Sequence, residues 1–364
     1  MKIRDLTLYR VDIPLYVPYV NKLQPQGMAS IDTIVCEVHD EDGRTGVGDA
    51  TVIPGYTHET YEGAWKFAKE HGEQLVSMET SAAKANLDPY RLSDSHAVSA
   101  LQVAIEMMEE NPLFDLPDQA IEVPILGAVN NKKLDEIPDE VEQLIGKGHR
   151  TLKVKVGWTP ADDLHRLEII QKANAGRADI RLDANQGFSR EDGIEFATSL
   201  QSDGELQLFE QPCDKADWDS NAAVAAVSNV PVMMDESIYG IADVERAATM
   251  KGCGFVKLKI SKLTGVDLLK QGLDRVRELG MTPVLGNGAA SDVGCFVEAC
   301  VARHTIDNAG ENNGYLKNRD QLFTQKLPFR NGSIILDSSF RPELDHETVN
   351  RLKLDEVRFA PVQV

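Results

Sequence analysis

The chain has 364 residues, of which 42% are apolar and 26% charged, as expected for a folded globular protein. Its formal net charge of −20 argues against nucleic acid or an anionic membrane as a partner, because both require a basic surface. No stretch approaches the roughly 18 apolar residues of a membrane span, and the N-terminus alternates charged and apolar residues, so we expect a cytoplasmic protein.

The first part of the chain predicts a small α+β unit. Apolar residues alternate in the way of antiparallel strands at 2–15 and 31–52. Apolar residues at helical spacing then indicate helices at about 58–76 and 95–110. Strands followed by helices are typical of an α+β domain.

From Val123 onward, short apolar runs alternate strictly with amphipathic stretches. We expect strands at 123–129, 151–157, 179–185, 206–212, 230–236, 254–260, 281–287 and 304–309, with seven helices between them. So many successive βα units favour a barrel. The predicted fold class is therefore α/β: a modified (β/α)7β TIM-type barrel with an N-terminal α+β capping domain.

The domain organisation follows from this change of pattern. We expect a capping domain at 1–117 and a barrel domain at 118–328. The segment 329–364 reads as extended, and we expect it to return to the capping domain. The five cysteines form no CxxC pair, and we interpret most of them as buried apolar side chains.

Five charged residues recur at a regular interval, each at or near the end of an apolar run. They are Lys155, Asp183, Glu210, Asp235 and Lys259, separated by 28, 27, 25 and 24 residues. This interval is about the length of one βα unit. The spacing therefore places one charge at the C-terminal end of each strand, which is the catalytic face of such a barrel.

The three acids of this set predict a metal site. Three carboxylates from successive strands, with room for water or substrate, suit Mg²⁺, with Mn²⁺ as a substitute. No His or Cys joins them, which argues against zinc. The alternative is that each acid caps a helix or pairs with a lysine.

The two lysines stand on the strands that flank the acids, so we expect Lys155 and Lys259 to face each other across the mouth. A lysine acts as a base when its pKa falls toward 7 to 8, and nearby cations lower it. Because residues two apart on a strand share a face, neighbouring polar residues can support the site. We assign supporting roles to Lys153, Asn185, Glu236 and Lys257.

The motifs KVKVG, DANQ, EQP, DES and KLKIS resemble those of the enolase superfamily, specifically its muconate-lactonizing-enzyme subgroup with the KxK signature. The resemblance covers the whole chain. It implies that Lys155 and Lys259 are the acid/base pair and that Asp183, Glu210 and Asp235 bind the metal. It also implies the shared reaction step, removal of a proton α to a carboxylate with the metal stabilising the product.

The loop after the seventh expected strand, LGNGAASDVG, departs from the subgroup pattern. Muconate lactonizing enzymes carry a glutamate there, whereas this chain has only Asp292, which argues against cycloisomerisation. Asp292 is itself a candidate substrate contact. In the subgroup's amino-acid and dipeptide epimerases, aspartates near the eighth strand hold the ammonium group of the substrate. Asp307 and Glu311 are the corresponding candidates here, and a helix cap or a solvated loop is the alternative.

The resemblance also implies that two segments of the first domain close over the mouth, at about 16–30 and 53–59. Tyr19, Met28, Tyr56 and His58 are the candidate specificity residues within them. Packing is the alternative role of each.

The predicted function is Mg²⁺-dependent acid/base chemistry on a small carboxylate. The reaction we favour is racemisation or epimerisation of an amino-acid derivative (an amino acid, a proline derivative or a dipeptide). The close alternative is a dehydratase that removes hydroxide from a hydroxylated proline or a sugar acid. Two rival classes are a Schiff-base aldolase, which leaves the three acids unexplained, and a barrel that only binds metal and ligand. We also expect a homo-oligomer.

Overall fold

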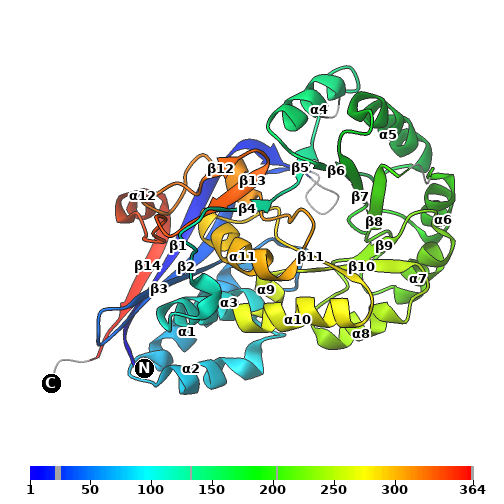
Figure 1. The fold of residues 1–364 in the computed structure, drawn as a ribbon. Coiled ribbons are helices and arrows are strands. Elements are labelled where there is room, and N and C mark those ends of the chain that lie inside the picture. The colour runs from blue at the N-terminus through cyan, green and yellow to red at the C-terminus, as the bar shows by residue number, and fades with distance from the viewer. Residues whose placement is uncertain (21–25, 132, 202–203, 362–364) are drawn as a thin grey trace.

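A computed structural model describes residues 1–20, 26–131, 133–201 and 204–361. Figure 1 shows two parts packed together: an antiparallel sheet with its own helices, and a curled parallel sheet surrounded by further helices. The predicted α/β class, a capped TIM-type barrel, is confirmed.

The N-terminal sheet has the strand order β14-β1-β2-β3, with every pair antiparallel. Its strands are β1 (Ile3–Tyr19), β2 (Met28–Asp40), β3 (Thr45–Thr51) and β14 (Lys353–Phe359). Both faces of β1 are buried, because Leu6 and Leu8 pack with the cap helices while Val11 and Ile13 join the barrel core. Alternation along one strand thus connects the two cores.

The helices of the cap are α1 (Tyr61–Leu75), α2 (Thr80–Leu87) and α3 (Ser95–Met108), with 3₁₀ turns η1 (Asp88–Tyr90) and η2 (Pro112–Phe114). Every residue of α3 is buried. Its close approach to β3 requires two glycines: a Cβ at Gly46 would lie 1.9 Å from the Ala104 oxygen, and one at Gly48 would lie 2.3 Å from the Ala100 oxygen. The predicted helices correspond to α1 and α3, and α2 is an addition.

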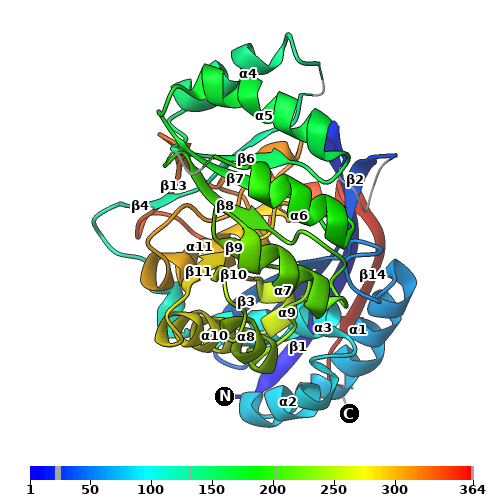
Figure 2. The ribbon, with the colours of Figure 1, turned by 90° about the vertical axis from the view of Figure 1, so that its right-hand side faces the viewer.

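The barrel sheet is parallel and has the order β11-β10-β9-β8-β7-β6-β5. Its strands are β5 (Gly127–Val129), β6 (Thr151–Lys155), β7 (Asp179–Asp183), β8 (Leu206–Glu210), β9 (Val232–Met234), β10 (Cys253–Leu258) and β11 (Thr282–Leu285). The helices are α4 (Ile137–Gly146), α5 (Pro160–Asn174), α6 (Arg190–Ser199), α7 (Trp218–Val227), α8 (Ile241–Ala248), α9 (Ile260–Leu263), α10 (Val266–Glu278) and α11 (Asp292–Thr305). Figure 2 shows α4 to α8 arranged along the outer side of this sheet.

The expected first barrel strand, 123–129, is divided in two. Its start belongs to β4 (Ile121–Pro124), which pairs antiparallel with β13 (Ser333–Leu336) in a small separate sheet completed by β12 (Phe329–Arg330). Only β5 enters the barrel. The partner β13 lies about two hundred residues further along the chain, and sequence alternation alone does not indicate such a pairing.

The prediction of an eighth strand at 304–309 is wrong. Helix α11 continues to Thr305, and its last turn carries Arg303, a cation that suits the negative end of a helix. The barrel closes slightly later, where Leu126 N donates to the Gly310 oxygen and Glu311 N donates to the Leu285 oxygen, at 2.9 and 2.8 Å. A short segment at 309–312 therefore takes the eighth position.

In the C-terminal part, after η3 (Gly314–Lys317) and α12 (His346–Leu352), strand β14 pairs with β1. The indole nitrogen of Trp65 donates to Asp355 Oδ2 at 2.8 Å and fixes α1 to this strand. The domain limits at residues 117 and 328 stay a prediction. All five cysteines are free, and four of them are buried. No helix formed by the described residues is long and apolar enough to cross a membrane.

Candidate active site

The five regularly spaced charged residues converge at one end of the barrel sheet. Lys155, Asp183 and Glu210 are the last residues of β6, β7 and β8. Asp235 and Lys259 each follow the end of a strand, β9 and β10, by one position. Parallel pairing sets Lys155 beside Asp183 and Asp183 beside Glu210. All five therefore lie at the C-terminal mouth of the barrel.

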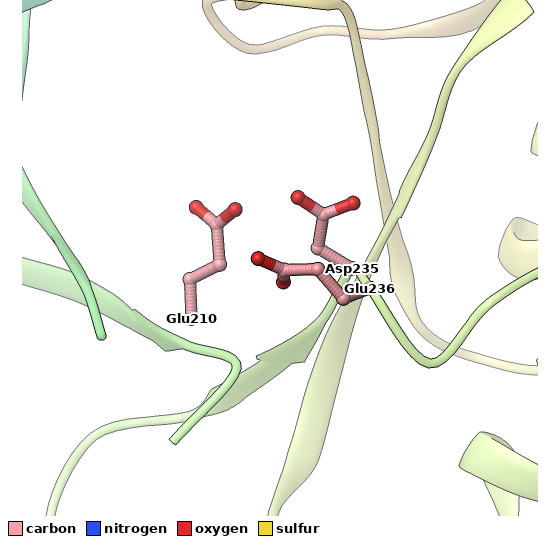
Figure 3. Close-up of side chains that lie close together, drawn as sticks. All are labelled: Glu210, Asp235 and Glu236. Carbon is pink, nitrogen blue, oxygen red and sulfur yellow. The ribbon is translucent and has the colours of Figure 1, made fainter. Parts of the chain in front are cut away.

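Three buried carboxylates form a compact group at this mouth. Glu210, Asp235 and Glu236 offer oxygen atoms that all lie within 4.8 Å of one another, and Figure 3 shows Glu210 approaching the other two from the opposite side. Asp183 is joined to this group by Lys153, whose Nζ lies 2.9 Å from both Asp183 Oδ2 and Glu210 Oε2. Glu236, which was expected only to support the site, thus lies among the acids themselves.

The inner lysines, Lys153 and Lys257, form ion pairs with the acids and neutralise their charge. Both bond to Glu311: Lys153 Nζ lies 2.7 Å from Oε1, and Lys257 Nζ lies 2.6 Å from Oε2. Lys257 Nζ is also 2.8 Å from Asp235 Oδ2. Burial opposes the charge of the two lysines, but the neighbouring carboxylates outweigh it and raise the pKa of both. They therefore remain cations and hold the acids in place.

The outer lysines, Lys155 and Lys259, occupy matching positions on the two sides of the acids. Lys155 Nζ donates to Asp183 Oδ2 at 2.5 Å and to Asn185 Oδ1 at 2.6 Å. Lys259 Nζ donates to Asp235 Oδ2 at 2.9 Å. Their side chains are 15% and 7% exposed, so Lys155 is the more accessible. Burial lowers the pKa of Lys155, but the charge of Asp183 outweighs this and raises it overall.

Tyr56 reaches from the cap into the mouth. Its hydroxyl donates to Asp235 Oδ1 at 2.7 Å and accepts a hydrogen bond from Lys259 Nζ. The same Nζ lies 4.0 Å from the centre of the tyrosine ring, within cation–π distance. Tyr56 packs with Ile53 and Ala289, which cover the mouth with an apolar surface.

A small cavity of roughly 40 Å³ lies under this cover. Both outer lysines, Asp183, Asp235 and the predicted specificity residues Tyr19 and Tyr56 line it. Met28 packs against the apolar cover, whereas His58 is exposed and hydrogen-bonded to the Ser93 oxygen at 2.7 Å, away from the cavity. Part of the expected closing segment 16–30, at 21–25, lies outside the described residues.

Two predicted substrate contacts require correction. Asp292 is buried, but its two oxygens accept from the backbone N–H groups of Leu322 and Phe323 at 2.7 and 2.9 Å, so it fixes a loop instead of facing the cavity. Asp307 is 91% exposed and pairs with Arg277 at 2.9 Å on the surface. Glu311 does line the cavity, although its oxygens are engaged by the two inner lysines.

Two further residues at the site, Lys262 and Glu298, were not predicted from the sequence. Lys262 Nζ donates to the backbone oxygens of Asp235 and Glu236 at 3.0 and 3.3 Å, and burial lowers the pKa of Lys262 to about 7. Glu298 accepts from Ile260 N at 3.3 Å and thereby fixes the backbone next to Lys259. Lys262 could have been predicted as the third lysine of the KLKISK segment. No sequence pattern indicated Glu298, because it lies on a helix distant in sequence.

The acid group fits a divalent cation. Glu236 Oε2 is buried and has no hydrogen-bond partner among the described residues. Burial first, and then the charge of Asp183, raises the pKa of Glu210 to about 8. Burial followed by the charge of Asp235 likewise raises the pKa of Glu236. A cation would satisfy the free oxygen and relieve this repulsion, and a ligand set made only of oxygen suits Mg²⁺.

Residues 136–341 match the protein family described as enolase C-terminal domain-like. This match covers more than half of the chain, so the protein belongs to this family. Its predicted place in the enolase superfamily, among the relatives of muconate lactonizing enzyme, is confirmed, and it is an enzyme of that superfamily.

Relatives with known activities extend over most of the chain. An L-Ala-D/L-Glu epimerase from Clostridium acetobutylicum is 26% identical over 371 residues, covering 96% of this chain and 100% of that protein. A dipeptide epimerase from Cytophaga hutchinsonii, solved with Mg and the dipeptide D-Ala-L-Val, superposes with a TM-score of 0.86 at 20% identity, covering 99% of this chain and 100% of that one. Muconate lactonizing enzyme from Pseudomonas putida gives 0.84 at 20% identity, with 97% and 100% covered. The two structural matches show the shared fold.

Proposed function

We propose that this protein is a Mg²⁺-dependent racemase or epimerase of an amino-acid derivative and that it removes the proton α to a carboxylate. The observation that carries the proposal is the placement of Lys155 and Lys259. They end β6 and follow β10, the two strands that flank the acid-bearing strands β7, β8 and β9. One lysine on each side permits removal of the proton from one face of the α-carbon and its return on the other.

Asp183, Glu210 and Asp235 would hold the metal, with Glu236 beside them. When bound, the cation supplies positive charge that stabilises the enolate form of the substrate carboxylate. Lys153 and Lys257 keep the acids oriented, because each bonds to at least two of the buried carboxylates.

The charge count of the site favours a neutral lysine. Five lysines and five carboxylates balance one another when all are ionised: Lys153, Lys155, Lys257, Lys259 and Lys262, and Asp183, Glu210, Asp235, Glu236 and Glu311. A divalent cation and a substrate carboxylate together add one positive charge. Loss of a proton from one of these five lysines restores the balance, and an outer lysine that loses it has the neutral form that a base requires.

The names of the relatives support an amino-acid derivative as substrate, since they include an L-Ala-D/L-Glu epimerase and a dipeptide epimerase. The dehydratase alternative, on a hydroxylated amino acid such as hydroxyproline or on a sugar acid, stays a prediction from the sequence. Mn²⁺ as a substitute metal, a homo-oligomer and a cytoplasmic location also stay predictions.

Proton NMR in D2O tests the proposed function directly. The Mg²⁺-loaded protein is incubated with amino acids, prolines, N-acyl amino acids and dipeptides, and loss of the α-proton signal is followed together with the appearance of the other isomer. We expect α-deuterium incorporation with interconversion of the two isomers. Loss of water from a hydroxylated substrate, with no interconversion elsewhere in the panel, would favour the dehydratase.

A further inference from the structure

The reaction cavity is too small to hold an amino-acid derivative by itself. Its volume of roughly 40 Å³ has room for only a few water molecules, each of which needs about 10–15 Å³. A second, much larger hollow of roughly 1,010 Å³ adjoins it. Tyr19 and Lys155 line both hollows, so the two hollows adjoin beside a predicted base. This larger groove has room for the part of a substrate distal to the reacting carbon.

The groove runs along β5, between the end of β1 and the 3₁₀ turn η3. Its lining residues include 16–20 from β1, 126–131 around β5, and parts of α4 and α5. Trp158, Leu316 and Tyr16 supply an apolar wall and are themselves partly exposed. The groove is therefore open to solvent at one side and continuous with the reaction cavity at the other.

The charge of the groove is opposite to that of the protein. Its basic lining residues are Lys147, Lys155, Arg166 and Lys317. The single acidic residue among those lining it is Glu140, whose two oxygens accept from the backbone N–H groups of Asn130 and Asn131 at 2.9 Å each. In a chain with a net charge of −20, such a concentration of cations in one hollow attracts an anion selectively.

Lys317 is placed where this anion would meet the reaction cavity. Its Nζ donates to the Gly288 oxygen and lies 4.9 Å from the centre of the Tyr19 ring, and both of these residues line the reaction cavity. Within the described part of the chain, no carboxylate forms an ion pair with Lys317, whereas the inner and outer lysines of the active site each have at least one. Burial lowers the pKa of Lys317 and outweighs the opposing charge of Glu311.

We propose that Lys317 determines specificity by pairing with a second carboxylate of the substrate, distal to the carboxylate at the reacting carbon. The ligand class is thus a dianionic amino-acid derivative, carrying the second carboxylate either on an N-acyl group or on the side chain of a dipeptide. This inference rests on the proposed function, which supplies the position of the reacting carbon. The ring of Tyr19 lies within cation–π distance of the Lys317 ammonium group and helps to hold it between the two hollows.

Two pairs of probes, each differing in one charge at nearly constant shape, test the proposal: L-Ala-L-Glu with L-Ala-L-Gln, and N-succinyl-L-alanine with its terminal amide. Binding to the full Mg²⁺-loaded chain is measured by calorimetry, and α-proton exchange is followed in D2O. The variants are Lys317→Gln, the conservative Lys317→Arg, and Lys251→Gln, which removes an exposed lysine outside the groove as a charge-matched control. Circular dichroism checks that each variant is folded.

We expect the unchanged chain to bind the charged member of at least one pair about tenfold to a hundredfold more tightly, the scale of one charge-assisted hydrogen bond. Lys317→Gln should remove this preference without weakening the neutral probe, while Lys317→Arg and Lys251→Gln keep it. The pair that responds identifies which end of the substrate carries the second carboxylate.

Equal affinity for both members of both pairs, including no binding of any, overturns the proposal, as does a preference that survives in Lys317→Gln. The two failures are distinguishable. A charge preference without α-proton exchange contradicts the proposed function alone, and exchange without a charge preference contradicts only the role of Lys317.

Discussion

The hydroxyl of Tyr56 donates a hydrogen bond to Asp235 Oδ1 at 2.7 Å, across 179 residues of sequence. Tyr56 belongs to the loop after β3 in the cap, whereas Asp235 follows a barrel strand and is a proposed metal ligand. The same hydroxyl accepts from Lys259. One side chain of the cap thus contacts both the proposed metal site and one proposed base, while Lys155 on the other side has no such contact with Tyr56.

This asymmetry predicts unequal effects of Tyr56→Phe on the two isomers of a substrate. Loss of the hydroxyl removes a partner of Lys259, so proton exchange of the isomer that faces Lys259 should slow by about tenfold or more, the scale of one hydrogen bond to a charged group. Exchange of the other isomer should change little. Isomer-resolved exchange in D2O measures both, with Tyr61→Phe, on α1, as the matched control. An equal loss for both isomers would assign Tyr56 to the acid group and not to Lys259.

Replacement of the proposed metal ligands should abolish turnover. Asp183→Asn, Glu210→Gln and Asp235→Asn each remove one charged oxygen donor, and calorimetry should show weaker Mg²⁺ binding for each. EDTA should inactivate the unchanged protein, and added Mg²⁺ should restore it. Full activity in the metal-free protein would contradict the metal assignment. Because these acids also neutralise buried lysines, their substitution is expected to cost about 3–5 kcal/mol of stability, and urea unfolding measures this separately.

Substitution of each outer lysine should abolish α-proton exchange of a different isomer. If each serves one face of the α-carbon, Lys155→Ala should still exchange the α-proton of the isomer that faces Lys259, although net interconversion is lost. Lys259→Ala should show the reverse pattern. The measurement is isomer-resolved exchange in D2O. Should one variant lose exchange with both isomers while the other keeps turnover, a one-base elimination becomes the better account. Reductive trapping with borohydride and a carbonyl substrate should give no adduct, in contrast to a Schiff-base aldolase.

Substitution of Glu311 distinguishes two possible roles of this residue: contact with a substrate ammonium group and support of the inner lysines. Its oxygens lie 2.7 and 2.6 Å from Lys153 and Lys257, so we expect Glu311→Gln to lower the free energy of unfolding by about 3–5 kcal/mol. Activity should fall to a similar extent on dipeptides, which have an ammonium group, and on N-acyl amino acids, which have none. A loss confined to the ammonium substrates would restore the role inferred from the resemblance. Asp307→Asn, an exposed surface change, is the control and should have no kinetic effect.

Asp49 should make the stability depend on pH. This buried carboxyl accepts from Ser291 Oγ at 2.6 Å, and burial, with a further contribution from Asp292, raises the pKa of Asp49 to about 7. The native state then binds more protons than the unfolded state between about pH 4 and pH 7, so the free energy of unfolding falls as the pH rises through this range. Over this range the free energy of unfolding should fall by on the order of 4 kcal/mol.

Urea unfolding at several pH values from 4 to 8 measures this contribution as the difference between the unchanged chain and Asp49→Asn. The variant should have a flatter profile, because an amide does not titrate. Asp135→Asn, at an exposed position, is the control. Parallel profiles for Asp49→Asn and the unchanged chain would show that Asp49 titrates alike in both states.

The barrel and the positions of its charges could be predicted from the amino-acid sequence. Strand and helix periods identified six of the barrel strands directly, and the interval from Lys155 to Lys259 indicated the end of the sheet at which the charges lie. This worked because a parallel barrel repeats one local unit, so the spacing along the chain reports the position around the ring. The family resemblance followed from the same residues.

Which of these charged side chains contact one another could be seen only in the folded structure. It placed Asp307 on the surface and Glu311, four residues later, between two buried lysines. It divided the first expected strand, because β13 captures the residues of β4. It also brought Tyr56 to Asp235 and left Lys317 without a carboxylate partner in the described chain. These outcomes depend on contacts between distant segments, whose energies are set by packing and burial and not by the local period of apolar residues.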